Sequence, residues 1–326
     1  MLQQVIDTRN ALKLILISIP GTLLAFFLHQ PFWMLTTFYA IAATIPYGTH
    51  KSYNLALLTL IFLFAATVLL DFLLTQSGIY FIIILSILSL VIGFIETHNP
   101  QFKTIGAYLF IGIIYASFEA RIYLTTPTFF TLTLLLLVSI LSLLLGFLIN
   151  EKDKTNDFHI NVIFSKANLL DYYVYFIPLL TTMIIWYFFD IAQPQWLMWS
   201  SLSVASLSIK QSRKKIQQRL LGGCIGVPLG LLIVFLLQGG NIVIHYLSFI
   251  GIMFTLRGIK KYTLAFASRC FFVVIFAGSH SLHIGGIRLL DVIIGGSVGL
   301  ASSILFTCIK QGWLTTKTHR NKQAGQ

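Results

Sequence analysis

Three charged residues near the end of the chain lie inside apolar stretches that are long enough to cross a membrane. Arg269 falls near the middle of residues 262–279, and Arg288 and Asp291 fall within residues 284–309. A charge at the centre of a bilayer costs at least ~2.5 kcal/mol, so such a side chain faces protein or water and has a partner. Counted at about 1.5 Å per residue, Arg269 and Asp291 lie roughly 15 and 10 Å deep, so we expect them to meet.

Two kinds of chemistry are open for these residues. The first is a structural ion pair between Arg269 and Asp291 that fixes how two neighbouring helices pack. The second is an anion site, in which the planar guanidinium of Arg269 binds a substrate carboxylate after its ion pair with Asp291 breaks. Protonation of Asp291 would release the arginine and would couple transport to a proton gradient. Arg288, one turn before Asp291, either competes for that carboxylate or extends to the lipid headgroups.

Two segments that are short for a membrane crossing carry a second group of polar side chains. Residues 32–47 and 196–209 occupy matching places in the two halves of the chain. Short or interrupted apolar segments in such places often form a transporter's central site, where backbone groups face a cavity. The alternative is that their hydroxyls hydrogen-bond across tight helix contacts. The candidate pathway residues are Thr36, Thr37, Tyr39, Trp196, Ser200 and Ser203.

Glycines recur four residues apart in two places. Gly222, Gly226 and Gly230 follow a basic run, and Gly295 and Gly299 follow Asp291 after one helical turn. This spacing places each set on one face of a helix, where the missing side chain lets another backbone come close. We predict close helix packing at all five.

The remaining reactive side chains do not suggest an enzyme. Three cysteines stand singly in apolar stretches, which is typical of buried thiols and favours neither disulfides nor a metal site. His280 and His283 are too few to hold a metal. Glu119 and Arg121 close an apolar stretch, and we expect them to pair at the membrane surface. The ten acidic residues are scattered and form no metal-binding cluster, so we predict no catalysis, no cofactor and no metal.

The composition requires a lipid environment. Apolar residues make up 57% of the 326 and charged residues only 10%, with a mean hydropathy of +0.86. A water-soluble protein has about 25% charged residues, which is far more than this chain has to cover its surface. The net charge of +12 could suit nucleic acid, but most of the 22 lysines and arginines lie in short segments between the apolar stretches or at their ends. Such placement is a membrane-topology signal. We predict an all-α polytopic membrane protein with no nucleic-acid partner.

The apolar stretches predict about twelve transmembrane helices. They cover residues 11–29, 32–47, 53–74, 78–96, 102–120, 127–150, 171–191, 196–209, 219–238, 241–257, 262–279 and 284–309. With the N-terminus inside, the basic residues fall on the cytoplasmic side except Arg121, Arg269 and Arg288, so both termini are expected in the cytoplasm. The predicted parts are a first six-helix unit at 1–150, a cytoplasmic linker at 151–170, a second six-helix unit at 171–309 and a basic cytoplasmic tail at 310–326.

The two units look like copies of each other. Pro31 and Pro194 lie 163 residues apart (194 − 31), and the same offset relates Trp33 to Trp196. This offset is half the chain. Because six is an even number of crossings, the copies are predicted to insert the same way up, as parallel repeats about an axis along the membrane normal.

Three short motifs carry a family resemblance. PQW at 194–196, RLLGGCIG at 219–226 after the basic run, and RLLDVIIG at 288–295 resemble the fusaric acid resistance and aromatic acid exporter family. The similarity covers residues 170–309 and is faint in the first half. It implies efflux of aromatic or other small organic acids across a bacterial inner membrane. Unlike many members, this chain has no room for a sizeable cytoplasmic domain between its two halves.

We therefore expect an inner-membrane exporter of small organic acids, aromatic ones above all, with proton-coupled transport. A passive organic-anion channel on the same scaffold is one alternative, since plant malate channels are distantly similar. A membrane subunit of a larger efflux assembly is another. The partners to consider are the acid itself, the lipid bilayer, a second copy of the chain in a homodimer, and a periplasmic adaptor protein.

Overall fold

The computed structural model describes residues 5–50, 52–98, 109–110, 112–119, 128–149, 169–237, 242–278 and 283–323. The described part of the first half contains α2 (Thr8–Leu28), η1 (Pro31–Met34), α3 (Leu35–His50), α4 (Tyr53–Gln76), α5 (Gly78–His98), a helical segment at 112–119 and α7 (Phe129–Phe147). The second half contains η3 (Leu169–Val174), α8 (Phe176–Phe189), α9 (Pro194–Val204), α10 (Ile209–Leu236), α11 (Ile242–Arg257), α12 (Tyr262–Gly278) and α13 (His283–Gln323).

Seven of the described helices are long and apolar enough to cross a membrane, and α11 and α12 are shorter apolar helices. Large apolar side chains point outward from them, including Phe130, Phe188, Phe189 and Phe235. In water this surface would be strongly unfavourable, whereas in a bilayer it meets lipid tails. The protein is therefore an all-helical, multi-pass membrane protein.

The two halves begin in a similar way. In each, the first long helix ends on a residue with a positive φ, His29 at 54° and Asp190 at 45°. A short element led by a proline follows, starting at Pro31 in one half and at Pro194 in the other. Proline suits the first turn of a helix because its φ is already helical and its missing N–H has no partner there.

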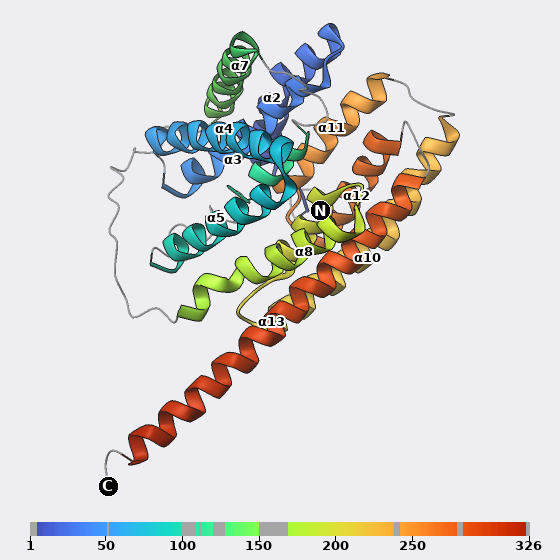
Figure 1. Ribbon diagram of the computed structural model, residues 1–326. Helices are drawn as coiled ribbons and strands as arrows, with labels where there is room; N and C mark the ends of the chain where they lie inside the picture. The colour runs from blue at the N-terminus through green and yellow to red at the C-terminus, as the bar shows by residue number, and fades with distance from the viewer. Residues whose placement is uncertain are drawn as a thin grey trace.

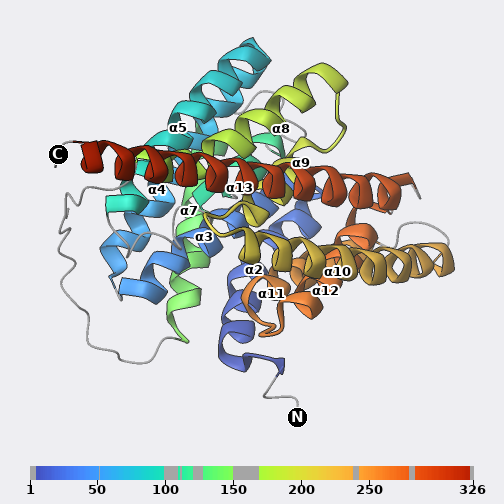
Figure 2. The same cartoon turned by 90° about the horizontal axis from the view of Figure 1, so that it is seen from below.

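The halves also contact each other in an exchanged pattern. The first long helix of each half packs on the fourth helix of the other, α2 on α11 and α8 on α5. The Tyr246 hydroxyl on α11 donates to the carbonyl of Ala25 on α2 at 2.9 Å. Figures 1 and 2 show the two chain halves interleaved in this way. A duplicated unit related by a two-fold axis would produce this exchange, and the six-helix repeat remains our prediction.

Glycine lets the helices of the second half come close together. A Cβ on Gly230 of α10 would lie 2.8 Å from the carbonyl oxygen of Phe271 on α12, and one on Gly226 would overlap the carbonyl of Ala267. Gly222 faces the same helix, and a Cβ there would lie 2.9 Å from the Phe266 ring. On α13, Gly295 and Gly299 face the backbone of α9 in the same manner. The helices α9, α10, α12 and α13 thus form one tightly packed group.

The structure changes three details of the predicted topology. The segment predicted at 196–209 is the 11-residue helix α9, which is about 16 Å long and shorter than the ~30 Å apolar core. The basic run at 210–219 is not a turn, because α10 starts at Ile209 and continues through it. The predicted tail is helical as far as Gln323, since α13 runs on without a break (Figure 1).

Some predicted features fall outside the described residues. These are Arg121, His280 and most of the linker at 151–170.

Candidate functional site

A cavity of about 330 Å³ lies where the two halves meet. It is bounded by η1 and α3, the segment 112–119, α9, α11 and α12, with Ile284 of α13 at one side. The sequence singled out two short segments, and the structure forms the first as η1 with α3 and the second as α9. Both border the cavity. Volumes of this size hold small organic ligands.

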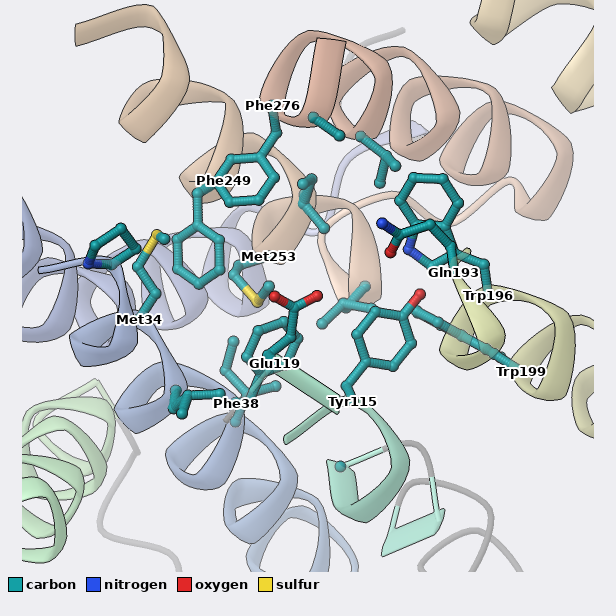
Figure 3. A pocket seen from close by; sticks show the side chains of 18 of the residues that line it. Met34, Phe38, Tyr115, Glu119, Gln193, Trp196, Trp199, Phe249, Met253 and Phe276 are labelled. Atoms are coloured by element: carbon teal, nitrogen blue, oxygen red, sulfur yellow. The ribbon is translucent and has the colours of Figure 1, made fainter. Parts of the chain in front are cut away.

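Aromatic rings form a continuous wall around this cavity. Trp199 meets Tyr115 edge-on at 5.0 Å between ring centroids, and Tyr115 stacks on Phe38 at 5.7 Å. The chain of contacts continues from Phe38 to Phe249 at 5.7 Å and from Phe249 to Phe276 at 5.9 Å. These rings come from five different segments, so the wall exists only in the folded protein (Figure 3).

The local structure of α9 explains how its two tryptophans reach the cavity. Trp196 and Trp199 are three residues apart and share one face of the helix. The backbone on the α13 side is pressed against Gly295 and Gly299. Because the helix is held closely from that side, both indoles are fixed in the cavity wall.

Besides Tyr115, two lining side chains carry titratable groups. The Glu119 carboxylate points into the ring-lined space (Figure 3) and accepts a hydrogen bond from Nε2 of Gln195 at 3.2 Å. The same amide nitrogen donates to Oε1 of Gln193 at 2.7 Å, and Oε1 of Gln195 is buried without a hydrogen-bond partner among the residues that the structure describes. His245 lies against Phe276, stacked at 4.1 Å, with Nδ1 at 2.9 Å from the Phe276 carbonyl.

Three buried arginines lie outside the cavity lining and contact aromatic rings. The Arg269 guanidinium lies 5.1 Å from the Trp199 ring, and that of Arg288 lies 5.0 Å from Trp196. Arg219, only 1% exposed, lies 4.4 Å from Phe266. Cation–π contacts of this kind are strongest where water is excluded. The guanidiniums therefore place positive charge against two of the cavity's rings without entering the cavity.

The structure shows partners for Arg269 other than the expected Asp291. Arg269 donates to the Thr255 hydroxyl at 3.1 Å and to the Thr255 carbonyl at 2.9 Å, both on α11. Oδ2 of Asp291 is buried and has no hydrogen-bond partner among the described residues. Because α12 packs mainly between α10 and α11, Thr255 of α11 lies within reach of its arginine. The ion pair with Asp291 stays a prediction.

Two of the predicted cations are placed unexpectedly. Arg219 was expected among the basic residues of the cytoplasmic side, and it is buried in the helix group of the second half. Arg288, for which snorkelling to the headgroups was one option, is 1% exposed, and its Nε and Nη1 have no hydrogen-bond partner in the described part of the chain. Both side chains share the neighbourhood of Phe266, since Arg288 lies 6.0 Å from that ring.

Two of the predicted hydroxyl residues bond to the backbone of their own helical turn. Thr36 donates to the Trp33 carbonyl at 2.7 Å, and Ser203 donates to that of Ser200 at 3.0 Å. Thr37, Tyr39 and Ser200 are buried. Of the nine predicted pathway residues, Trp196 is the one found among the described lining residues.

The sequence analysis missed the aromatic wall and the role of Glu119. Tyr115 and Glu119 are four residues apart, and an acid on the same helical face as a tyrosine inside an apolar stretch was a signal for an inward-facing pair. Phe249 and Phe276 offered no such signal, because the chain has 28 phenylalanines and many face lipid. In the part of the chain that the structure describes, no group of three His, Cys, Asp or Glu side chains could hold a metal ion.

Comparison with known families bears on the same region. Residues 180–302 match a family model described as fusaric acid resistance protein-like. This match covers less than half of the chain. It runs from α8 into α13 and includes both cavity tryptophans, and it confirms the resemblance carried by the sequence motifs. Neither the curated proteins nor the solved structures gave a match. The family and the apolar helices together indicate a role in membrane transport.

Proposed function

We propose that this protein exports small organic acids with aromatic rings across a bacterial inner membrane. The observation that supports this most strongly is the cavity between the halves, which is walled by aromatic rings and has two guanidiniums against its tryptophans. An engineered apolar cavity of only ~150 Å³ already binds benzene, so about 330 Å³ leaves room for a ring with substituents.

Each part of the substrate has a matching feature. A flat ring gains dispersion and edge-to-face contacts with Phe38, Tyr115 and Phe249. The carboxylate is attracted by the positive field of Arg269 and Arg288, which is weakly screened because both side chains are buried. An aliphatic acid of the same charge would lose the ring contacts, so we expect aromatic acids to be preferred.

Proton coupling is part of the proposal. The Glu119 carboxylate lines the cavity, and the buried Asp291 lies on α13 one turn after Arg288; carboxylates inside membrane proteins commonly serve as proton carriers. The proposal includes no catalytic role, since the chain supplies the cavity with rings and few reactive groups.

The test is transport by the full-length protein in proteoliposomes. Loaded vesicles would release benzoate and, separately, an aliphatic acid of similar length, with and without an imposed pH gradient. We expect faster release of benzoate and acceleration by the gradient. Release that follows the anion's own gradient, whatever the pH difference, would instead identify a passive channel. If neither acid leaves faster than it does from loaded vesicles without protein, transport by this chain alone is excluded. Co-purification would then show whether the chain serves an assembly with a periplasmic adaptor or a second copy.

A further inference from the structure

The charge inside the cavity has the opposite sign from that expected for a simple acid site. Among the described lining residues, Glu119 is the one that carries a formal charge at neutral pH, with His245 counted as neutral. The arginines contact the tryptophans but do not line the space. A ligand inside the cavity is therefore in contact with a wall whose formal charge is negative.

Glu119 has little to offset its charge within the protein. Its hydrogen bond from Gln195 is 3.2 Å long, and the donating nitrogen is shared with Gln193. No described cation forms an ion pair with it. A carboxylate with one shared amide donor in an apolar cavity is costly, and a cation within hydrogen-bond reach would offset that cost.

The rings next to Glu119 also suit a cation. Phe38, Tyr115 and Phe249 line the cavity, and no described arginine or lysine lies over any of them. The two rings that already hold a guanidinium are the tryptophans of α9. A ring face without a protein cation attracts an ammonium group through its quadrupole. The wall near Glu119 is thus an open aromatic cage, and the wall at α9 carries positive charge.

We propose that the cavity selects aromatic acids that also carry a protonated nitrogen, and that Glu119 is the residue that receives this nitrogen. The inference rests on the proposed function and names its substrate class. The ammonium group would donate to Glu119 within the cage, and the acid group would lie toward Trp196, where Arg288 provides positive charge. Gln195 positions the carboxylate, since its Nε2 donates to Glu119 from the first turn of α9.

The test compares two ligands of equal size and shape. Para-(aminomethyl)benzoate carries the proposed nitrogen, and para-ethylbenzoate has a methyl group in its place. Binding to the purified full-length protein would be followed by quenching of tryptophan fluorescence and by calorimetry, and transport by release from proteoliposomes. We expect para-(aminomethyl)benzoate to bind at least about tenfold tighter than para-ethylbenzoate, which is the usual effect of one hydrogen bond to a charged group.

Two matched variants show whether Glu119 is responsible. Glu119→Gln keeps the shape and an acceptor for Gln195, and it should remove the preference for the amino compound. Glu96→Gln removes a buried carboxylate of α5 that does not line the cavity, and it should leave the preference intact. A monodisperse elution profile for both variants would show that they fold.

The outcomes separate this inference from the proposed function. If para-ethylbenzoate binds as well as the amino compound, or if the preference survives in Glu119→Gln, the inference is overturned and export of aromatic acids stands. If neither compound binds or moves, the proposed function fails, and the inference fails with it.

Discussion

Substituting one glycine of α13 tests whether the packing of α9 holds the cavity wall. A Cβ on Gly295 would lie 2.6 Å from the Cβ of Ser200 and would overlap the carbonyl of Leu197, both on α9. Carbon atoms normally approach to ~3.5–4.0 Å, so α9 would have to move by about 1 Å in Gly295→Ala. Gly286 is the matched control, because it lies on the same helix and a Cβ there meets nothing within 4 Å.

The expected magnitudes follow from two opposed terms. Both variants gain up to ~1 kcal/mol because alanine is the better helix former. Only Gly295→Ala also suffers overpacking, which typically costs ~1–3 kcal/mol. The apparent melting temperature in detergent should therefore rise or stay level for Gly286→Ala and should lie roughly 2–8 °C lower for Gly295→Ala than for that control.

The assay is thermal unfolding followed by intrinsic fluorescence, with transport measured on the same preparations. Because α9 carries Trp196 and Trp199, the Gly295 variant should also lose transport of aromatic acids, whereas the control should not. Equal shifts of melting temperature in the two variants would refute the close contact between α9 and α13.

Two further predictions concern the cavity and the contact between halves. Ala277→Phe adds a ring at the lining of the cavity and should reduce aromatic-acid transport at least about tenfold, because the ring occupies ligand space. Leu264→Phe, at an exposed position of the same helix, should leave transport unchanged. Release from vesicles compares the two variants, and equal rates would exclude this cavity as the pathway. Tyr246→Phe removes the hydrogen bond to the Ala25 carbonyl and should cost about 1 kcal/mol. Melting curves would show this loss beside Tyr262→Phe, a more exposed tyrosine of α12, and a loss in both variants alike would contradict the bond's role.

Particular residues show how far the sequence could be interpreted. The apolar stretches predicted α2, α4, α5 and α7 to within a few residues, because a helix satisfies the backbone polar groups that lipid cannot. The start of α10 and the end of α13 lie ten or more residues outside the predicted stretches. Pro31 and Pro194 marked the short elements, since proline favours the first turn and the length that follows is too small for a crossing. The glycines at 222, 226 and 230 predicted a close helix contact, and α12 lies there.

The cavity could not be predicted in the same way. Arg269 was expected to meet Asp291 because their helices are neighbours in the chain, but α12 packs chiefly on α10 and α11. Arg269 instead contacts Thr255 of α11 and Trp199 of α9. Neighbours along the sequence and neighbours in space differ in a bundle, and hydropathy carries no information on which helix faces which.

The sequence alone thus determined that this chain is a helical membrane protein, where its long helices run and which glycines press helices together. These properties depend on local composition and on the cost of placing polar groups in lipid. Only the tertiary structure decided that rings from five separate segments enclose one space with Glu119 inside it and the arginines behind the tryptophans. A cavity depends on side chains far apart in the chain, and their meeting is set by how the helices of both halves pack.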